Sequence, residues 1–330
     1  MSFKGKRVLV TGADGFIGSH LAETLARQGA QVRAFCMYNS SGSWGWLDTL
    51  EPEVKSQLDV VLGDIRDARF VMQSCREMEL IFHLAALIAI PYSYQAPESF
   101  IDTNVRGTLN VLEAVRQGGC ARMVHASTSE VYGTPDTLPI TETHPLKGQS
   151  PYSASKIAAD KLCEAYACSF ETPVVVLRPF NTYGPRQSAR AVLPSILLQL
   201  LGGATEVRLG SLWPRRDFTF VDDTVRGFLQ AGSCELQPGE VIQLGTGKAV
   251  SIGELFEQIC RMLGVKARTV TDPLRLRPKG SEVAELLSNP ARARERLGWQ
   301  PEVSLEEGLR RTVEWIEAHT AGHQLERYYV

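Results

Sequence analysis

A tyrosine and a lysine four residues apart carry the chemistry that this sequence most directly suggests. Tyr152 and Lys156 lie in the segment 150–156, at the start of an apolar run with helical periodicity. At this spacing both side chains share one face of a helix. An ammonium group favours the ionised form of a nearby phenol, whose ordinary pKa is about 10, so the pair predicts a tyrosine that acts as a base near neutral pH. A tyrosine and a lysine on an ordinary helix surface can have the same spacing. The elements before and after the pair must therefore show whether it is catalytic or a surface pair.

The N-terminal segment predicts a strand, a glycine turn and a helix, in that order. A β-branched run at 7–10 precedes the turn at 11–18, and a helical pattern follows from 19 to 28. Glycines at GxxGxxG spacing allow a tight turn and a close approach of pyrophosphate to backbone N–H groups. The turn therefore predicts a bound dinucleotide. The residues expected to contact it here are Gly12, Gly15, Phe16, Ile17 and Gly18.

The second predicted strand, at 31–36, leaves the choice between NAD and NADP open. It is not followed by the acidic residue that would bind the free hydroxyls of an adenosine ribose. The neutral segment with Asn39 and Ser40 is expected to contact the ribose and could accept a 2′-phosphate, although no arginine follows the strand directly. The same segment is also compatible with a simple polar turn.

Strands continue to alternate with helices through the first half of the chain. Apolar runs at 60–65, 80–86 and 122–127 predict three more strands, which indicates a parallel, doubly wound sheet with ligands over the carboxyl ends of the strands. His83 ends one of these strands and is interpreted as a structural histidine rather than a metal ligand. The further residues expected at the cofactor groove are Asp64, Ile65, Leu84, Ala85, Ala86 and Asn104.

Composition excludes several classes of protein. The chain has 330 residues, 44% of them hydrophobic, and a formal net charge of -2, which is typical of a soluble globular enzyme. No basic block suits a nucleic-acid partner, and no apolar run approaches the ~20 residues of a membrane span. The seven cysteines include no CxxC pair, which argues against a disulfide framework and a zinc site, so no metal is predicted. The N-terminus lacks a signal-like apolar region, so we expect a cytoplasmic protein.

The order of motifs along nearly the whole chain resembles the extended short-chain dehydrogenase/reductase family, which comprises nucleotide-sugar epimerases, dehydratases and decarboxylases. The matching segments are 11–18, 64–65, 83–86, 128–130, Tyr152 with Lys156, 178–181, 183–186, 216–218, Asp222 and 297–299. The resemblance implies a Rossmann-like doubly wound sheet with a smaller C-terminal α/β substrate lobe. It also implies a dinucleotide-binding domain at 1–180 and a nucleotide-sugar-binding lobe that is mainly 181–330 and interleaved with the first.

The resemblance also implies roles for the strand-end residues. Thr128 would bind the 4-hydroxyl of the sugar, and Tyr152 as a phenolate would remove its proton. Lys156 would hold the nicotinamide ribose and lower the pKa of Tyr152. The C4 hydride would pass to a tightly bound NAD or NADP that is restored within each turnover.

Glu130 distinguishes among the reactions of the family. A carboxylate beside the 4-keto sugar can remove the C5 proton, and loss of the C6 hydroxyl followed by hydride return gives a 4-keto-6-deoxy sugar. The 4-epimerases usually carry a small residue here, whereas UDP-glucuronate decarboxylases share the Thr-Ser-Glu turn. Ser129, counted with the catalytic residues, matches GDP-mannose dehydratases rather than dTDP-glucose dehydratases. A 4,6-dehydratase is therefore the leading hypothesis, a decarboxylase or 4-epimerase the alternative, and a non-catalytic dinucleotide sensor the remote one.

The segments around 36–48 and 181–194 resemble the dehydratases of legionaminic-acid-type pathways, although Trp44 and Trp46 are also compatible with a hydrophobic loop anchor. Guanidinium groups suit phosphate oxygens, so arginines of the C-terminal lobe are expected to bind the nucleotide diphosphate. The predicted substrate-binding residues are Asn181, Arg190, Arg216, Arg277 and Glu282. The loop that carries Arg277 is equally compatible with an exposed basic loop. Family members usually dimerise through helices that fall here at about 100–117 and 152–170, so we expect a homodimer. The nucleotide base and the sugar remain open.

Overall fold

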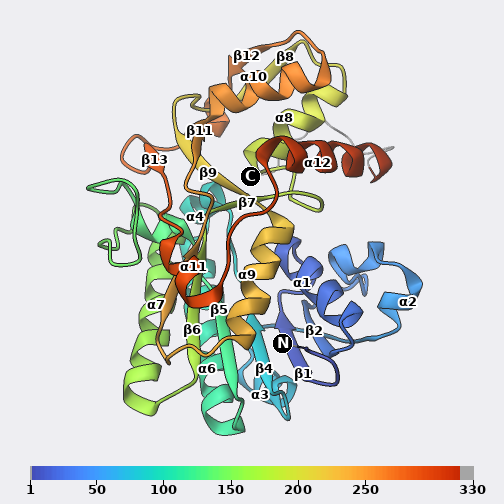
Figure 1. Ribbon diagram of the computed structural model, residues 1–330, viewed down its shortest axis with the longest axis vertical. Coiled ribbons are helices and arrows are strands. Elements are labelled where there is room, and N and C mark those ends of the chain that lie inside the picture. Colours follow the sequence, from blue (N-terminus) through green and yellow to red (C-terminus); the bar gives the residue numbers. More distant parts are fainter. Residues whose placement is uncertain (1, 320–330) are drawn as a thin grey trace.

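A seven-stranded parallel sheet forms the centre of the larger lobe of this computed structural model, which describes residues 2–319 (Figure 1). The strand order is β3-β2-β1-β4-β5-β6-β10, which is the doubly wound arrangement with one further strand at its edge. The strands are β1 (Arg7–Thr11), β2 (Gln31–Met37), β3 (Leu58–Gly63), β4 (Leu80–His83), β5 (Arg122–Ala126), β6 (Val174–Pro179) and β10 (Val241–Leu244). The predicted α/β class is therefore confirmed, and each strand predicted in the first half is present.

Helices cover both faces of this sheet because its strands are apolar on both faces. Val8 and Val10 of β1 enter one core with α1 and α9, whereas Leu9 enters a second core with α3, α6 and α7. This alternation follows from the two-residue period of a strand. The helices are α1 (Phe16–Arg27), α3 (Ala68–Cys75), α6 (Gly107–Gly118), α7 (Pro151–Phe170) and α9 (Val221–Ser233).

Several shorter helical segments lie between the strands and the longer helices. They are η1 (Gly45–Thr49), α2 (Pro52–Lys55), α4 (Ile90–Gln95), α5 (Pro97–Phe100), a π-helical turn η2 (Ile101–Arg106), η3 (Ser129–Tyr132) and η4 (Pro273–Arg275). The π-helical turn runs directly into α6, and such turns are frequent at functional sites.

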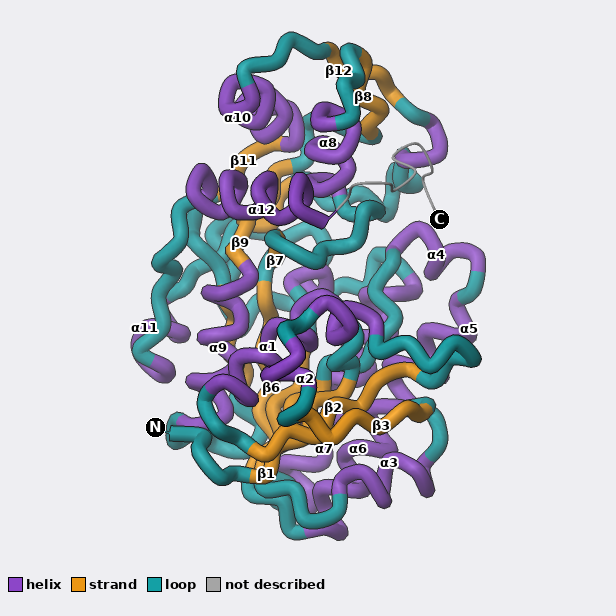
Figure 2. Tube along the Cα trace, turned by 90° about the vertical axis from the view of Figure 1, so that its right-hand side faces the viewer, coloured by secondary structure: helices purple, strands orange, loops and turns teal. Residues whose placement is uncertain are grey.

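The smaller lobe lies beyond the carboxyl ends of the parallel strands and holds α8, α10 and α12 together (Figures 1 and 2). Its strands are β7 (Asn181–Tyr183), β9 (Arg215–Phe220), β11 (Ala249–Ser251) and β13 (Glu285–Leu286) in one sheet, with β8 (Glu206–Leu209) and β12 (Arg268–Thr271) in another. Its helices are α8 (Val192–Leu201), α10 (Ile252–Leu263) and α12 (Leu305–His319). Ser251 and Glu254 form a capping box at the start of α10, which fixes the entry to that helix.

The chain passes between the two lobes several times. Strand β10 and helix α9 follow residue 180 in the sequence, yet β10 pairs with β6 and α9 packs on the first core. Helix α11 (Ala291–Leu297) contacts β10 as well. The larger lobe is therefore assembled from both halves of the chain.

Within residues 2–319, no helix is long and apolar enough to cross a bilayer. The same part of the chain contains no group of three or more His, Cys, Asp or Glu side chains placed to hold a metal ion.

Trp299 is expected to be a major source of stability, because its side chain is fully buried and its indole N–H donates to the Asp223 carbonyl oxygen at 2.8 Å. We predict that Trp299→Ala lowers the free energy of unfolding by about 3–5 kcal/mol. The matched control is Trp213→Ala, since Trp213 is 57% exposed, and a surface substitution changes stability by about 0.5 kcal/mol or less. Urea denaturation measures both. If both variants lost the same free energy of unfolding, the burial of Trp299 would not be a major source of stability.

Candidate active site

The turn between β1 and α1 requires glycine at two of its positions. Gly12 has a φ of +70°, and a Cβ atom there would lie 2.8 Å from the Ala85 backbone nitrogen. A Cβ atom at Gly18 would lie 2.0 Å from the Gly12 carbonyl oxygen. Gly15 is the N-cap residue of α1, which has no side-chain cap and no acidic residue in its first turn. Its N-terminal N–H groups therefore remain available to an anion, which fits the pyrophosphate of a dinucleotide.

The loop after β4 is held against this turn by buried polar contacts. The Thr11 hydroxyl accepts hydrogen bonds from the backbone nitrogens of Leu84 and Ala85, each at 3.2 Å. His83 lies between two hydroxyl groups, with Nδ1 2.8 Å from Thr11 Oγ1 and Nε2 3.0 Å from Thr108 Oγ1. Burial lowers the pKa of His83 to about 3, so the ring is neutral. These contacts agree with the interpretation of His83 as a structural histidine.

Asn104 orders the next part of that loop. Its amide oxygen accepts from Leu87 N at 2.8 Å, and its amide nitrogen donates to Leu87 O and Ser155 Oγ, both at 2.9 Å. Asn104 is 1% exposed. These three bonds fix the loop to α7. The contact of Asn104 with the cofactor stays a prediction.

The segment after β2 forms the polar turn that was the alternative interpretation of Asn39. The Asn39 amide donates to Met37 O at 3.2 Å and to Ser43 O at 2.8 Å, and its oxygen accepts from Ser43 N at 3.0 Å. Ser40 stays exposed. The polar groups of Asn39 thus hold the turn itself, and they supply no argument for either NAD or NADP.

Two further predicted cofactor residues lie after β3. The Asp64 carboxylate pairs with Arg66 at 2.5 Å, and this hydrogen bond lowers the pKa of Asp64. Ile65 is buried, and Gly107 at the start of α6 approaches it so closely that a Cβ atom would lie 2.8 Å from Ile65 Cγ2. Asp64 is thus ionised at the strand end, while Ile65 packs in the core. Ala86 follows in the partly buried loop after β4.

A tryptophan contact joins the loop after β2 to the end of the chain. The Trp46 ring lies edge-to-face with that of Trp315 in α12, with centroids 5.3 Å apart, and Trp46 N donates to the Asp14 carbonyl oxygen at 3.1 Å. Trp46 is therefore the loop anchor that the sequence allowed. Through Asp14, the same loop contacts the glycine turn.

Tyr152 and Lys156 are both buried, which makes the reading as a surface pair wrong. They lie in the first two turns of α7, which begins at Pro151 behind a capping box formed by Ser150 and Ser153. Lys156 is 3% exposed and donates to the Ala126 carbonyl oxygen at 2.6 Å. Burial lowers the pKa of Lys156 to about 8. The ammonium is thus held at the end of β5, where the nicotinamide is expected.

The expected lowering of the Tyr152 pKa by Lys156 is wrong for the protein groups alone. Burial raises the pKa of the Tyr152 phenol, and a hydrogen bond with Thr128 opposes this only in part. The negative charge of Glu130 raises the pKa further. Lys156 bonds to a backbone carbonyl instead, so the phenolate needs an additional positive charge in the site.

The end of β5 turns Thr128 and Glu130 toward this pair. Thr128 precedes η3, and its hydroxyl accepts a hydrogen bond from Glu130 N at 3.2 Å. Ser129 is 3% exposed, so its hydroxyl lies inside the protein. The structure thus brings Thr128, Glu130 and Tyr152 together from β5 and α7.

A charged cluster connects Glu130 to the smaller lobe. Its Oε1 atom lies 3.6 Å from Arg277 Nη1, and that nitrogen lies 3.8 Å from Glu282 Oε1. Arg216 donates to the same Glu282 oxygen at 3.3 Å and to Val283 O at 2.9 Å. Arg277 Nη1 is buried without a hydrogen-bond partner. The interpretation of Arg277 as an exposed basic loop residue is therefore wrong, because its Nη1 atom is buried. Arg277 meets three other predicted site residues at the boundary between the lobes, namely Glu130, Arg216 and Glu282.

The two remaining predicted substrate residues differ from each other. Asn181 in β7 has a buried amide oxygen without a hydrogen-bond partner, which leaves it free for a ligand. Arg190 is exposed, and its backbone nitrogen and Nε both lie 3.4 Å from Ser188 Oγ. The structure therefore does not bring Arg190 to the cluster.

Sequence reasoning missed Tyr94, whose hydroxyl lies 2.5 Å from Ser281 Oγ beside Arg277. Tyr94 belongs to α4 and has no motif around it, so no local pattern marks it. The Tyr94 and Ser281 hydroxyl groups therefore lie next to the charged cluster on the side that faces α4.

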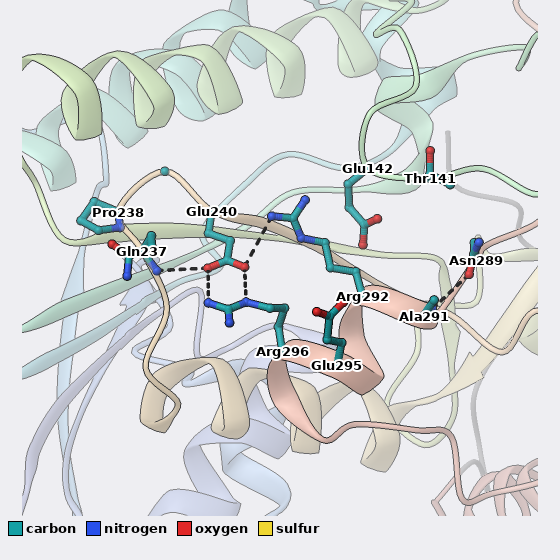
Figure 3. Close-up of a pocket in the computed structure, with 11 residues that line it drawn as sticks. Thr141, Glu142, Gln237, Pro238, Glu240, Asn289, Ala291, Arg292, Glu295 and Arg296 are labelled. Carbon is teal, nitrogen blue, oxygen red and sulfur yellow. Dashed lines mark hydrogen bonds and ion pairs between the residues drawn. The ribbon is translucent and has the colours of Figure 1, made fainter.

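A cavity of about 650 Å³ lies elsewhere, beside the edge strand β10 (Figure 3). Residues 237–240 line it and directly precede β10, so it sits at the amino end of that strand. Glu240 at its centre is paired with Arg296 at 2.7 Å and with Arg292 at 3.4 Å. The cavity is therefore separate from the groups at the carboxyl ends of β1, β4 and β5.

Comparison with known proteins agrees with this arrangement. The family model described as GDP-mannose 4,6 dehydratase matches residues 9–312. The chain belongs to the extended short-chain dehydrogenase/reductase family of nucleotide-sugar dehydratases and epimerases. Family membership and the Rossmann-like fold are thereby confirmed.

Relatives in this family divide between two activities. A UDP-glucose 4-epimerase of Mycolicibacterium smegmatis is 36% identical over 94% of this chain and 98% of its own length. A dTDP-glucose 4,6-dehydratase of Streptomyces antibioticus is 33% identical over 95% of this chain and 93% of its own length. The solved structure of DesIV, a dTDP-glucose 4,6-dehydratase from Streptomyces venezuelae with NAD and TYD bound, has a TM-score of 0.84 and 32% identity and covers 95% of this chain and 97% of that one.

Replacing Gly18 by alanine should weaken dinucleotide binding at least about tenfold, which is ~1.4 kcal/mol, because the added Cβ would collide with the Gly12 carbonyl oxygen. The control is Gly118→Ala at the end of α6, where a Cβ atom meets nothing within 4 Å. Fluorescence titration with NAD and with NADP measures the affinities. If Gly18→Ala binds as tightly as the control, the turn does not hold the dinucleotide.

Proposed function

We propose that this protein is a nucleotide-sugar 4,6-dehydratase that converts a nucleoside diphosphate hexose to its 4-keto-6-deoxy form. The observation that carries the proposal is the position of Glu130, which lies beside Thr128 and Tyr152 and also contacts Arg277 of the smaller lobe. A 4-epimerase has no need of a carboxylate at this point, because it returns the hydride to C4. A dehydratase needs one to remove the proton from C5.

The proposal includes a tightly bound NAD or NADP. The glycine turn, the N-terminus of α1 and Asp64 would hold the adenosine and pyrophosphate part, and Lys156 would hold the nicotinamide ribose. The bound nicotinamide would supply the hydride acceptor at C4, the hydride donor at C6 and a positive charge near Tyr152. The crowded contacts of Gly12 and Gly18 and the uncapped start of α1 support this fit.

In this proposal, the residues of the chain divide the proton transfers between them. Thr128 donates a hydrogen bond to the 4-hydroxyl, and Tyr152 accepts its proton. Glu130 then removes the C5 proton, which the C4 carbonyl makes acidic, and donates that proton to the C6 hydroxyl, which leaves as water. The proton that Tyr152 took from the 4-hydroxyl is returned to C5 as the hydride reaches C6, so the product differs from the substrate by one water molecule.

Arg216, Arg277 and Asn181 would bind the diphosphate and the sugar phosphate, and Glu282 the nucleoside ribose. Arg277 Nη1 and Asn181 Oδ1 are buried without hydrogen-bond partners, which supports their assignment to a ligand. The exposed Arg190 contributes only if its loop moves. The two domains at 1–180 and 181–330 would thus close over the substrate between them.

We further propose a cytoplasmic homodimer that pairs α6 and α7 of the two subunits. Phe170 at the end of α7 is 52% exposed and Ile101 near α6 is 49% exposed, which gives apolar contacts to such an interface.

The alternative within the family is a 4-epimerase, which the similarity to the Mycolicibacterium smegmatis enzyme favours. Mass spectrometry after incubation with UDP-, GDP-, dTDP- and CDP-linked hexoses separates the candidates. We expect loss of one water molecule from at least one substrate. An unchanged mass with altered sugar stereochemistry would instead establish an epimerase, and loss of carbon dioxide from a uronate a decarboxylase. If no substrate is converted, the result would favour the remaining alternative, a non-catalytic dinucleotide sensor.

The substitution Glu130→Gln should slow elimination by roughly 10²–10⁴-fold and spare C4 oxidation, because it removes one general base and leaves Tyr152 in place. Reduced nicotinamide should therefore accumulate, which its absorbance measures. The control Glu295→Gln makes the same change at an exposed position in the cavity beside β10. Unimpaired water loss in Glu130→Gln would remove Glu130 from the mechanism.

A further inference from the structure

A buried carboxylate follows Lys156 by one turn of α7. Tyr152, Lys156 and Asp160 are spaced four residues apart, so their side chains form one stripe along the helix. Their exposed fractions are 7%, 3% and 4%. The stripe faces β5 and β6, since Lys156 bonds to Ala126 and Asp160 pairs with Arg178. Asp160 has no part in the proton transfers described above.

Asp160 is only partly satisfied by its neighbours. Its Oδ2 atom accepts from Arg178 Nε at 3.0 Å. Its Oδ1 atom has no hydrogen-bond partner and lies 3.6 Å from His125 Nε2. Arg178 is shared with Tyr132, whose hydroxyl accepts from Arg178 Nη1 at 3.2 Å. The Ser127 hydroxyl lies close enough to help lower the Asp160 pKa, but it makes no well-formed hydrogen bond with Oδ1.

Few of the groups around Lys156 carry a charge near neutral pH. Burial lowers the pKa values of His83 on β4 and His125 on β5, so both rings are neutral. Burial raises the pKa of Cys163 on α7, so its thiol keeps its proton. The cations are Lys156 and Arg178. Burial raises the pKa of the Asp160 carboxyl, whereas the charge of Arg178, 3.0 Å away, lowers it and favours the carboxylate. Glu130 is a further carboxylate on the side of Tyr152. An ammonium without such a carboxylate would lose its proton readily in this environment.

We propose that Asp160 is the positioning residue that keeps Lys156 charged and so preserves the cation beside Tyr152. The inference rests on the proposed function in that Lys156 must be an ammonium for C4 oxidation. Burial disfavours the ammonium, and the charge of Asp160 offsets part of that cost. Without Asp160, Lys156 loses its proton at a lower pH, and the alkaline limit of C4 oxidation moves down with it.

The test is a direct titration of Lys156, which needs no substrate. The protein is labelled with ¹³C at the lysine Cε atoms, and the Lys156 resonance is assigned by its absence in Lys156→Met. We expect the midpoint to fall by about one pH unit or more in Asp160→Asn, the size of shift that a neighbouring opposite charge produces. Asp160→Glu keeps the negative charge, so its Lys156 midpoint should stay close to that of the wild-type protein. Leu162→Ala, at a partly buried neutral position on the same helix, should leave the midpoint unchanged, which excludes a general loss of packing as the cause.

Asp160→Ser keeps the test decisive if Asp160→Asn does not fold, because it removes the charge and keeps a hydroxyl oxygen that can accept from Arg178. The Lys156 midpoint should fall in this variant by a similar amount. A midpoint that stays unchanged in the folded variant overturns the inference. Once a substrate is found, the alkaline limb of C4 oxidation should move by the same amount as the NMR midpoint. A wild-type protein that oxidises no sugar would refute the proposed function and leave the NMR result standing.

Discussion

The ammonium of Lys156 is almost completely buried at the end of β5. Burial makes a charge at this position costly in free energy, and the neighbouring groups determine whether it is kept. Burial lowers its pKa to about 8, close enough to neutrality that its neighbours decide whether it is charged. The Ala126 carbonyl oxygen accepts one of its hydrogen bonds, and the neutral rings of His83 and His125 add no competing charge. Tyr152, one turn earlier on the same helix, meets the same cost, because its own burial favours the protonated phenol.

A second group of charges joins the two lobes. Glu130 lies in η3, just after the central strand β5, whereas Arg216, Arg277 and Glu282 belong to the smaller lobe. The distances between them, from 3.3 to 3.8 Å, are those of loose ion pairs rather than tight ones. Loose pairs in a partly buried place are suited to exchange partners with an anionic ligand, because their charges are compensated but their hydrogen bonds are incomplete.

The sequence was sufficient for the elements and for the groups that act within one of them. The two-residue and 3.6-residue periods locate β1, α1 and α7, and the i,i+4 spacing places Tyr152 beside Lys156. It was insufficient where partners come from distant segments. The contact of Arg277 with Glu130, the bond of Lys156 to Ala126 and the clamp made by Asn104 are tertiary contacts, and no local pattern encodes them. The wrong expectation for the Tyr152 pKa has the same origin, since the degree of burial is a property of the folded chain.

The contact between Trp46 and Trp315 has a mechanical consequence. It ties the last described helix of the smaller lobe to the loop after β2, and the bond from Trp46 N to Asp14 O continues the connection into the glycine turn. Any displacement of α12 relative to the larger lobe must therefore either separate the two rings or carry the loop after β2 with it.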